Sequence, residues 1–154
     1  MHDISIEMLA PEQIRAAYPL LRQAVPGLTL GAWLRMAPRV ANPKRRGETG
    51  IVIARRQGRP FPCGLFCYRM SRDLEHGAVL VADCFVGLDI VGPEDVLQAL
   101  IAELDALARR LRCKAVHSVV RNGWPELARG LSAAGHRPES ATFCKLVHEL
   151  PVAW

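Results

Sequence analysis

The sequence has no long apolar run and few aromatic residues. No segment approaches the ~20 consecutive apolar residues that a membrane-spanning helix needs. The first residues show neither the basic nor the apolar region of a signal peptide. Aromatic residues make up 6% of the chain and charged residues 23%, but half of all residues are hydrophobic, which excludes an intrinsically disordered chain. We therefore expect a folded, cytoplasmic protein that does not enter the membrane.

The sequence also lacks the cysteine pattern of a secreted or zinc-binding protein. The five cysteines are Cys63, Cys67, Cys84, Cys113 and Cys144. They are odd in number and spread over long intervals, which is unlike a disulfide framework. Cys63 and Cys67 are the one close pair, and no second pair of cysteine or histidine ligands lies near them, so no metal site is expected. Reduced thiols that behave as small buried hydrophobic side chains are the better interpretation.

The length and charge of the chain restrict its partners. With 154 residues, the chain is predicted to form a single domain over residues 1–154. Twenty Lys and Arg against fifteen Asp and Glu give a net charge of +5, which favours anionic ligands such as phosphate-bearing cofactors or nucleic acid. The basic run Lys44-Arg45-Arg46 has no interleaved aromatic residues and belongs to no recognition motif. Nucleic acid is therefore not the expected partner.

Hydrophobic periodicity divides the chain into strands and helices. Residues 79–86 form a nearly continuous apolar run, which is typical of a strand covered on both faces. Apolar residues between Leu97 and Leu111 recur at helical spacing, which predicts a long amphipathic helix. Pro19 is expected to bend or interrupt the first helix. In chain order we expect a strand over 4–8, helices over 11–25 and about 33–40, strands over 50–57, 64–70 and 79–86, a helix over 93–112, a strand over 113–120, a helix over 125–134 and a last strand over 141–148.

The order of these elements predicts the fold class. The order is β-α-α-β-β-β-α-β-α-β, which indicates an α/β fold with a central mixed sheet of about six to seven strands flanked by helices. We also expect strand 79–86 to diverge from strand 113–120 at its far end, leaving a V-shaped opening.

The second half of the chain resembles a known family. An apolar strand ends in Phe85-Val86, a long helix and another strand follow, and then come Asn122, a short helix and Ala134-Gly135-His136. This arrangement is similar to the GNAT superfamily of acyl-CoA-dependent N-acyltransferases. The resemblance spans nearly the whole chain in its order of elements and rests on a handful of positions at residue level.

The resemblance implies a function and a set of binding residues. It implies transfer of an acetyl or other acyl group from acetyl-CoA or another acyl-CoA to an unknown small-molecule or peptide amine, with a homodimer as one possible assembly. Pantetheine would pair with the backbone of the splayed strand, and the pyrophosphate would lie at the start of the following helix. The cofactor-binding positions implied are Phe85, Val86, Gly87, Leu88, Gly92, Glu94, Asp95 and Asn122.

Two features depart from the family pattern. The phosphate loop of the family is rich in glycine, whereas the matching stretch here has one useful glycine, then Pro93 and the carboxylates of Glu94 and Asp95. The tyrosine that often protonates the leaving thiolate is replaced by Leu131. These departures keep open the alternative of a catalytically inactive GNAT-like module that binds a small ligand or a protein partner through the same cleft.

Asp83 is the expected catalytic residue. It is the single carboxylate in an apolar strand beside the implied thioester site, and burial there would make it a stronger general base. The competing interpretation is structural, with Asp83 holding a backbone N–H or an arginine. Cys84 as a nucleophile is a weaker hypothesis, because the sequence shows no base beside it. Trp33 and Trp124 could line an acceptor pocket, but the hydrophobic core is the preferred place for both.

Overall fold

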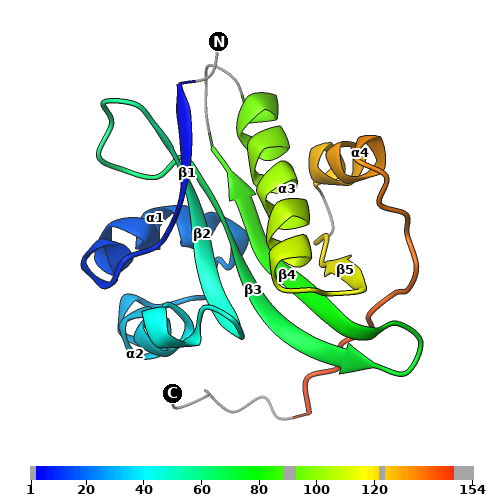
Figure 1. Ribbon diagram of the computed structural model, residues 1–154. Coiled ribbons are helices and arrows are strands. Elements are labelled where there is room, and N and C mark those ends of the chain that lie inside the picture. The colour runs from blue at the N-terminus through cyan, green and yellow to red at the C-terminus, as the bar shows by residue number, and fades with distance from the viewer. Residues whose placement is uncertain (1–2, 89–92, 122–123, 148–154) are drawn as a thin grey trace.

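The computed structural model describes residues 3–88, 93–121 and 124–147 (Figure 1). None of the helices in these ranges combines the length and the apolar character that crossing a membrane requires. The elements in chain order are β1 Ile4–Met8, η1 Pro11–Gln13, α1 Ile14–Ala24, α2 Leu30–Val40, η2 Pro43–Arg45, β2 Thr49–Arg56, β3 Gly64–Asp73, β4 Gly77–Gly87, α3 Pro93–Arg110, β5 Ala115–Ser118 and α4 Pro125–Ala133.

The strands form one mixed sheet in the order β1-β2-β3-β4-β5. The first four strands pair antiparallel with their neighbours, and β5 pairs parallel with β4. A parallel pair needs a crossover connection, and α3 provides it. The predicted mixed α/β architecture is confirmed, with five strands in the described residues in place of the six to seven expected.

Helices cover both faces of the sheet (Figure 1). The helices α1 and α2 pack on one face, and α3 and α4 pack on the other. Successive side chains along a strand point to opposite faces of the sheet, so the hydrophobic core has two parts. On β2, Ile51 and Ile53 face α1 and α2. Val52 and Ala54 of the same strand face α3. The apolar strands are therefore covered on both sides, as the run of apolar residues in β4 predicts.

The α3 helix is the element that the sequence predicts best. Leu100 and Leu104 are fully buried against the sheet, and Leu97, Ile101 and Leu107 are at most 5% exposed. Burying each such side chain contributes roughly 1.5–3 kcal/mol. Acidic residues occupy the first turn and arginines the last, which complements the helix dipole.

Pro19 does not interrupt α1. The helix runs from Ile14 to Ala24 with Pro19 in its interior. Proline has no backbone N–H, so the helical hydrogen bond from residue 19 to the carbonyl of Arg15 is missing. Burial of Leu20 and Leu21 beside the proline holds this segment on the sheet, so tertiary packing outweighs the lost bond.

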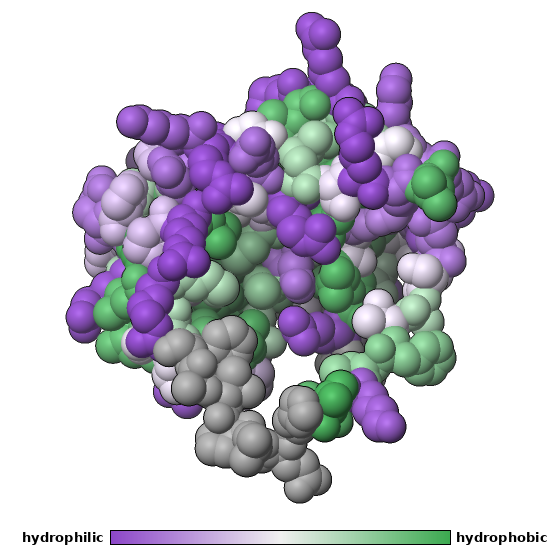
Figure 2. All heavy atoms as spheres, turned by 90° about the horizontal axis from the view of Figure 1, so that it is seen from below, coloured by the Kyte–Doolittle hydropathy of each residue, from purple (hydrophilic) through white to green (hydrophobic). Residues whose placement is uncertain are grey.

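The predicted last strand is not present in the described residues. Residues 141–147 form no strand, and Phe143, Leu146 and Val147 are at least 80% exposed. Figure 2 shows the end of this segment standing away from the body, with green apolar side chains open to solvent. A strand needs a partner for its backbone groups, and the outermost strand of the sheet, β5, is only four residues long. Position 148 lies outside the described residues.

Candidate active site

Strands β4 and β5 part in the middle of β4. Their register runs from Val79 opposite Ala115 to Ala82 opposite Ser118, and the N–H of Val119 donates the last bond to Ala82 O at 2.9 Å. From residue 83 to residue 87, β4 remains paired with β3 but has no partner on the β5 side among the described residues. The V-shaped opening expected from the sequence is confirmed.

A β-bulge lies at the point of divergence. Cys67 pairs with Asp83 and Leu65 pairs with Val86, so Phe66 alone faces Cys84 and Phe85. Cys84 has φ of 56°, a left-handed conformation that costs a non-glycine residue about 1–3 kcal/mol. The Cys84 N–H donates to Oδ1 of Asp83 at 2.6 Å, which satisfies a backbone group that the bulge removes from the ladder. The bulge turns β4 away from β5.

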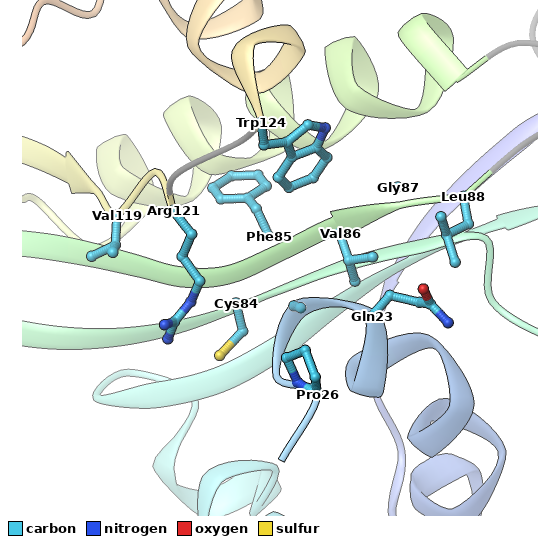
Figure 3. Close-up of a pocket in the computed structure, with 11 residues that line it drawn as sticks. Gln23, Pro26, Cys84, Phe85, Val86, Gly87, Leu88, Val119, Arg121 and Trp124 are labelled. Carbon is cyan, nitrogen blue, oxygen red and sulfur yellow. The ribbon is translucent and has the colours of Figure 1, made fainter. Parts of the chain in front are cut away.

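A cavity of about 490 Å³ occupies the opening (Figure 3). Three segments line it: the end of α1 and the turn after it, the diverging half of β4, and the segment between β5 and α4. Phe85 and Trp124 lie on the α3 side of β4, and the Cys84 side chain points to the opposite side. The lining residues are Gln23, Ala24, Pro26, Cys84, Phe85, Val86, Gly87, Leu88, Val119, Arg121 and Trp124.

The polar side chains of the cavity lining are those of Gln23, Cys84 and Arg121, and the Cys67 thiol acts on Cys84 from outside the lining. A hydrogen bond from the Cys67 thiol lowers the pKa of Cys84, and the Arg121 guanidinium acts in the same direction. Burial and the Asp83 carboxylate oppose this shift. The hydrogen bond to Cys84, followed by burial, raises the pKa of Cys67. Cys84 is therefore the more easily ionised thiol of the pair, and it lines the cavity.

The Asp83 side chain lies beside the cavity and does not line it. The expectation that Asp83 is buried is wrong, because its side chain is 42% exposed. Its Oδ1 accepts the Cys84 N–H and lies 3.7 Å from a guanidinium nitrogen of Arg121. The structural interpretation of Asp83 named a backbone N–H or an arginine as its partner, and the structure shows both.

The other predicted cofactor-binding residues fall into three groups. Four of them, Phe85, Val86, Gly87 and Leu88, line the cavity together. Glu94 and Asp95 are exposed in the first turn of α3 and are not part of the lining. Gly92 and Asn122 lie outside the described residues.

Aromatic side chains occupy different places from one another. Trp33 is buried, and its indole N–H donates to Ile14 O, which confirms the preferred core position. Trp124 packs against the core and also lines the cavity. Tyr18 and Tyr68 line no part of the cavity and donate to the carbonyls of residues 28 and 46. Leu131 is buried in the core, and its hydrocarbon side chain has no proton to donate.

Sequence reasoning missed Arg121 and Gln23 as cavity residues. Arg121 lies in the loop after β5, which ends at Ser118, and loop residues after the strands of a sheet often carry function, which is the available signal. Gln23 comes from the last turn of α1, where no local pattern marks it.

The strand order, the parallel β4-β5 pair that diverges and the helices on both faces define a GNAT fold. No protein-family model and no curated protein matches the sequence. Similar solved structures agree with this fold class over nearly the whole chain.

Three such structures illustrate the likeness. AAC(6')-Iy in complex with the bisubstrate analogue CoA-S-monomethyl-acetylneamine has a TM-score of 0.78 at 16% identity, covering 95% of this chain and 99% of the other. Glucosamine-6-phosphate N-acetyltransferase from Arabidopsis thaliana has a TM-score of 0.75 at 11% identity, covering 96% and 100%. A ribosomal-protein-alanine N-acetyltransferase from Brucella melitensis biovar Abortus 2308 has a TM-score of 0.72 at 15% identity, covering 94% and 99%.

Proposed function

We propose that this chain is an acyl-CoA-dependent N-acyltransferase whose reaction takes place in the cavity between β4 and β5. The observation that carries the proposal is the open edge of β4 over residues 83–87, which lines a cavity of about 490 Å³. A backbone edge without a neighbouring strand can bind an extended amide-containing ligand as an added strand. The pantetheine arm of CoA is such a ligand.

The binding residues follow from this placement. The backbone of Phe85, Val86, Gly87 and Leu88 would pair with pantetheine, and Trp124 would cover it from the α3 side. The predicted phosphate positions Gly92, Glu94, Asp95 and Asn122 stay predictions. The resemblance of the fold to AAC(6')-Iy, whose structures contain CoA and a CoA-linked acetylneamine analogue, supports acetyl-CoA as the donor and an amine as the acceptor.

Asp83 is our candidate for the general base. Its two contacts are made by Oδ1, which leaves Oδ2 for a water molecule that would relay the proton from an amine in the cavity, because Asp83 does not itself line the cavity. The amine nitrogen attacks the thioester carbonyl carbon, its proton passes to Asp83, and the carbon–sulfur bond breaks to release the CoA thiolate. No tyrosine of the described chain lines the cavity, so the thiolate would leave as an anion near the Arg121 guanidinium.

An inactive GNAT-like module is the second candidate. The observation that favours it is the start of α3, where the carboxylates of Glu94 and Asp95 are exposed in the first turn. Carboxylates at this position oppose a bound pyrophosphate, because they already occupy the positive end of the helix dipole.

Acyl-CoA binding and amine-dependent thiol release separate the two candidates. Acetyl-CoA at 100 times its dissociation constant should stabilise the protein by ~2.7 kcal/mol. Turnover is then followed as free CoA thiol in the presence of an aminoglycoside, an amino sugar phosphate or a peptide with an N-terminal alanine. Arg121→Ala should weaken acetyl-CoA binding, whereas the matched control Arg129→Ala, on the exposed side of α4, should not.

The outcomes are distinct. Stabilisation with amine-dependent thiol release supports the enzyme. Stabilisation without release from any of these amines favours the inactive module. No binding of acetyl-CoA, or binding that Arg121→Ala leaves unchanged, contradicts the proposed site.

A further inference from the structure

A cluster of histidines and carboxylates lies at the closed end of the β4-β5 pair, away from the cavity. Asp73 ends β3, His76 lies in the turn that leads into β4, and His117 lies in β5. Glu139 comes from the segment after α4, and the structure brings it onto the same two histidines. Three separate parts of the chain thus contribute side chains to one place, which we name the hairpin cluster (Asp73, His76, His117 and Glu139).

The distances in the hairpin cluster are short. Nε2 of His76 lies 2.7 Å from Oε1 of Glu139, and Nε2 of His117 lies 3.0 Å from Oε2 of the same carboxylate. Nε2 of His117 lies 3.7 Å from Oδ2 of Asp73. The donor atoms of Asp73, His76 and His117 all lie within 4.8 Å of one another. Glu139 thus bridges the two imidazole rings on one side, and Asp73 lies beside His117.

These separations suit a divalent metal ion. Zinc binds histidine nitrogen and carboxylate oxygen at about 2.0–2.2 Å, so two ligands of one ion lie at most about 4.4 Å apart. The donor atoms of Asp73, His76 and His117 are close to this limit, and Glu139 lies within 3.0 Å of a nitrogen of each histidine, which makes it the nearest fourth ligand. Two imidazoles with two carboxylates form a nitrogen and oxygen donor set that zinc accepts, and four ligands complete its tetrahedron.

A second observation points into the same space. Nε2 of His117 is buried, yet it has no hydrogen-bond partner in the part of the chain that the structure describes. A carboxylate oxygen, Oε2 of Glu139, lies beside this nitrogen at an ion-pair distance of 3.0 Å. Buried polar atoms normally have a hydrogen-bond partner. This imidazole nitrogen lies beside two carboxylates, and a metal ion bound there would use its lone pair.

The charges of the cluster agree with a cation. Backbone and charge interactions with His76 lower the pKa of Asp73, and hydrogen bonding to His76 lowers the pKa of Glu139, so both carboxylates stay ionised. The hydrogen bond to Glu139 raises the pKa of His76, with Asp73 and Glu75 acting in the same direction.

We propose that Asp73, His76, His117 and Glu139 form a structural binding site for a divalent transition-metal ion of the zinc type. This differs from the expectation of no metal site, which rested on cysteine spacing. The ligands are far apart in sequence, so no local motif reveals them. The metal would tie the segment after α4 to the β3-β4 turn and to β5. Apart from Glu139, the described side-chain tie of that segment is His136 to Asp105 at 3.0 Å.

Titration of the metal-free protein with Co²⁺, followed by displacement with Zn²⁺, tests the site. The expected result is a visible absorption of tetrahedral Co²⁺ without a sulfur-to-cobalt charge-transfer band, removed by Zn²⁺. Glu139→Gln changes an exposed side chain and should not affect folding. Glu139→Gln and His117→Gln should each weaken Co²⁺ binding by at least about 10–100-fold. Removing a residue that only hydrogen-bonds to a metal ligand typically costs that much, and these two residues would be ligands themselves.

The matched control is His136→Gln, which changes a histidine of the same segment outside the hairpin cluster and should leave Co²⁺ affinity unchanged. As a second readout, Zn²⁺ should slow trypsin cleavage after Lys145 in the unaltered protein and not in Glu139→Gln. A charge-transfer band would place the metal on cysteines and overturn the proposal. Equal affinity in Glu139→Gln, His117→Gln and the unaltered protein, or no binding at millimolar Co²⁺, would overturn it as well.

Discussion

The two halves of β4 differ in structure although they continue the same apolar sequence. Residues 79–82 pair with strands on both sides, and all four are at most 8% exposed. Residues 83–87 pair with β3 alone and line or border the cavity. The first half is a structural element with every backbone group in a ladder, whereas the outer edge of the second half has no neighbouring strand among the described residues.

The bulge produces this difference. Before the bulge, Leu80 and Ala82 face α3, and after it Phe85 does, so one extra residue moves the alternation from even to odd positions. The core on each face is preserved while the strand turns away from β5. If the proposed site is right, the first half supplies stability and the second half supplies binding, and substitutions in the two halves should have separable effects.

The largest effect should come from the closed half. Leu80→Ala removes a fully buried side chain from the α3 face and should lower the free energy of unfolding by about 2–5 kcal/mol. Chemical denaturation measures the change. Leu88→Ala is the matched variant, at the residue that directly follows the open half: Leu88 is 51% exposed and lines the cavity, so we expect a stability change within ~0.5 kcal/mol but weaker acetyl-CoA binding. Equal loss of stability in both variants would remove the distinction between the halves.

Asp83 lies at the border of the two halves. As the general base, Asp83→Asn should lower turnover by roughly 100-fold while the fold is kept, because the amide oxygen can still accept the Cys84 N–H. Turnover and melting temperature are measured on one preparation, with Glu126→Gln on the exposed side of α4 as a control. A stability loss of ~1–3 kcal/mol with unchanged turnover per folded molecule would instead assign Asp83 to holding the bulge.

Cys84 should be the reactive thiol of the open half. Thiolate is the species that reacts with iodoacetamide, and each unit by which a pKa is lowered gives about tenfold more thiolate below that pKa. Because its pKa is lowered and those of Cys67 and Cys113 are raised, Cys84 should be alkylated faster than either and reach its maximal rate at lower pH. Peptide mass spectrometry measures the three rates.

Two variants and a ligand sharpen this test. Cys67→Ala removes the thiol that donates to Cys84 and should move the alkylation profile of Cys84 to higher pH. Cys113→Ala, at a residue outside the cavity lining, should not. Saturating acetyl-CoA should protect Cys84. Unprotected Cys84 in the presence of bound acetyl-CoA would place the ligand elsewhere.

The smallest effect should come from the start of α3. Glu94→Gln and Asp95→Asn each remove an exposed carboxylate from the first turn. Each change should strengthen acetyl-CoA binding by ~0.3–1 kcal/mol, about two- to fivefold, because it removes repulsion of the pyrophosphate. Calorimetry at low salt measures this gain. Unchanged affinity in the double variant would place the pyrophosphate away from this helix start.

The fold follows from the sequence where one pattern extends over many residues. The helix stripe of Leu97, Leu100, Ile101 and Leu104 spans several turns, and only one arrangement buries it. The apolar run in β4 predicts a central strand for the same reason. The strand expected at 141–148 shows the limit: its apolar residues suit a strand, but strand formation also depends on a partner, which a sequence pattern does not reveal.

The candidate site is predictable only in part. The resemblance places Phe85, Val86, Gly87 and Leu88 together, and the structure does the same. The bulge at Cys84 was not predictable, because its left-handed φ is typical of glycine and no glycine marks it. The structure shows that the Asp83 side chain supports the bulge by accepting the Cys84 N–H.

Amide chemical shifts of the protein titrated with acetyl-CoA test the central claim most directly, because they report on each half of β4 separately. We predict that the amides of residues 84–88 shift on binding, together with those of Arg121 and Trp124. The amides of residues 79–82 should stay within the spread of the remaining core, because both of their ladders are already complete. Shifts confined to the closed half, or saturation without any change at residues 84–88, would contradict the assignment of the open edge of β4 as the acyl-CoA site.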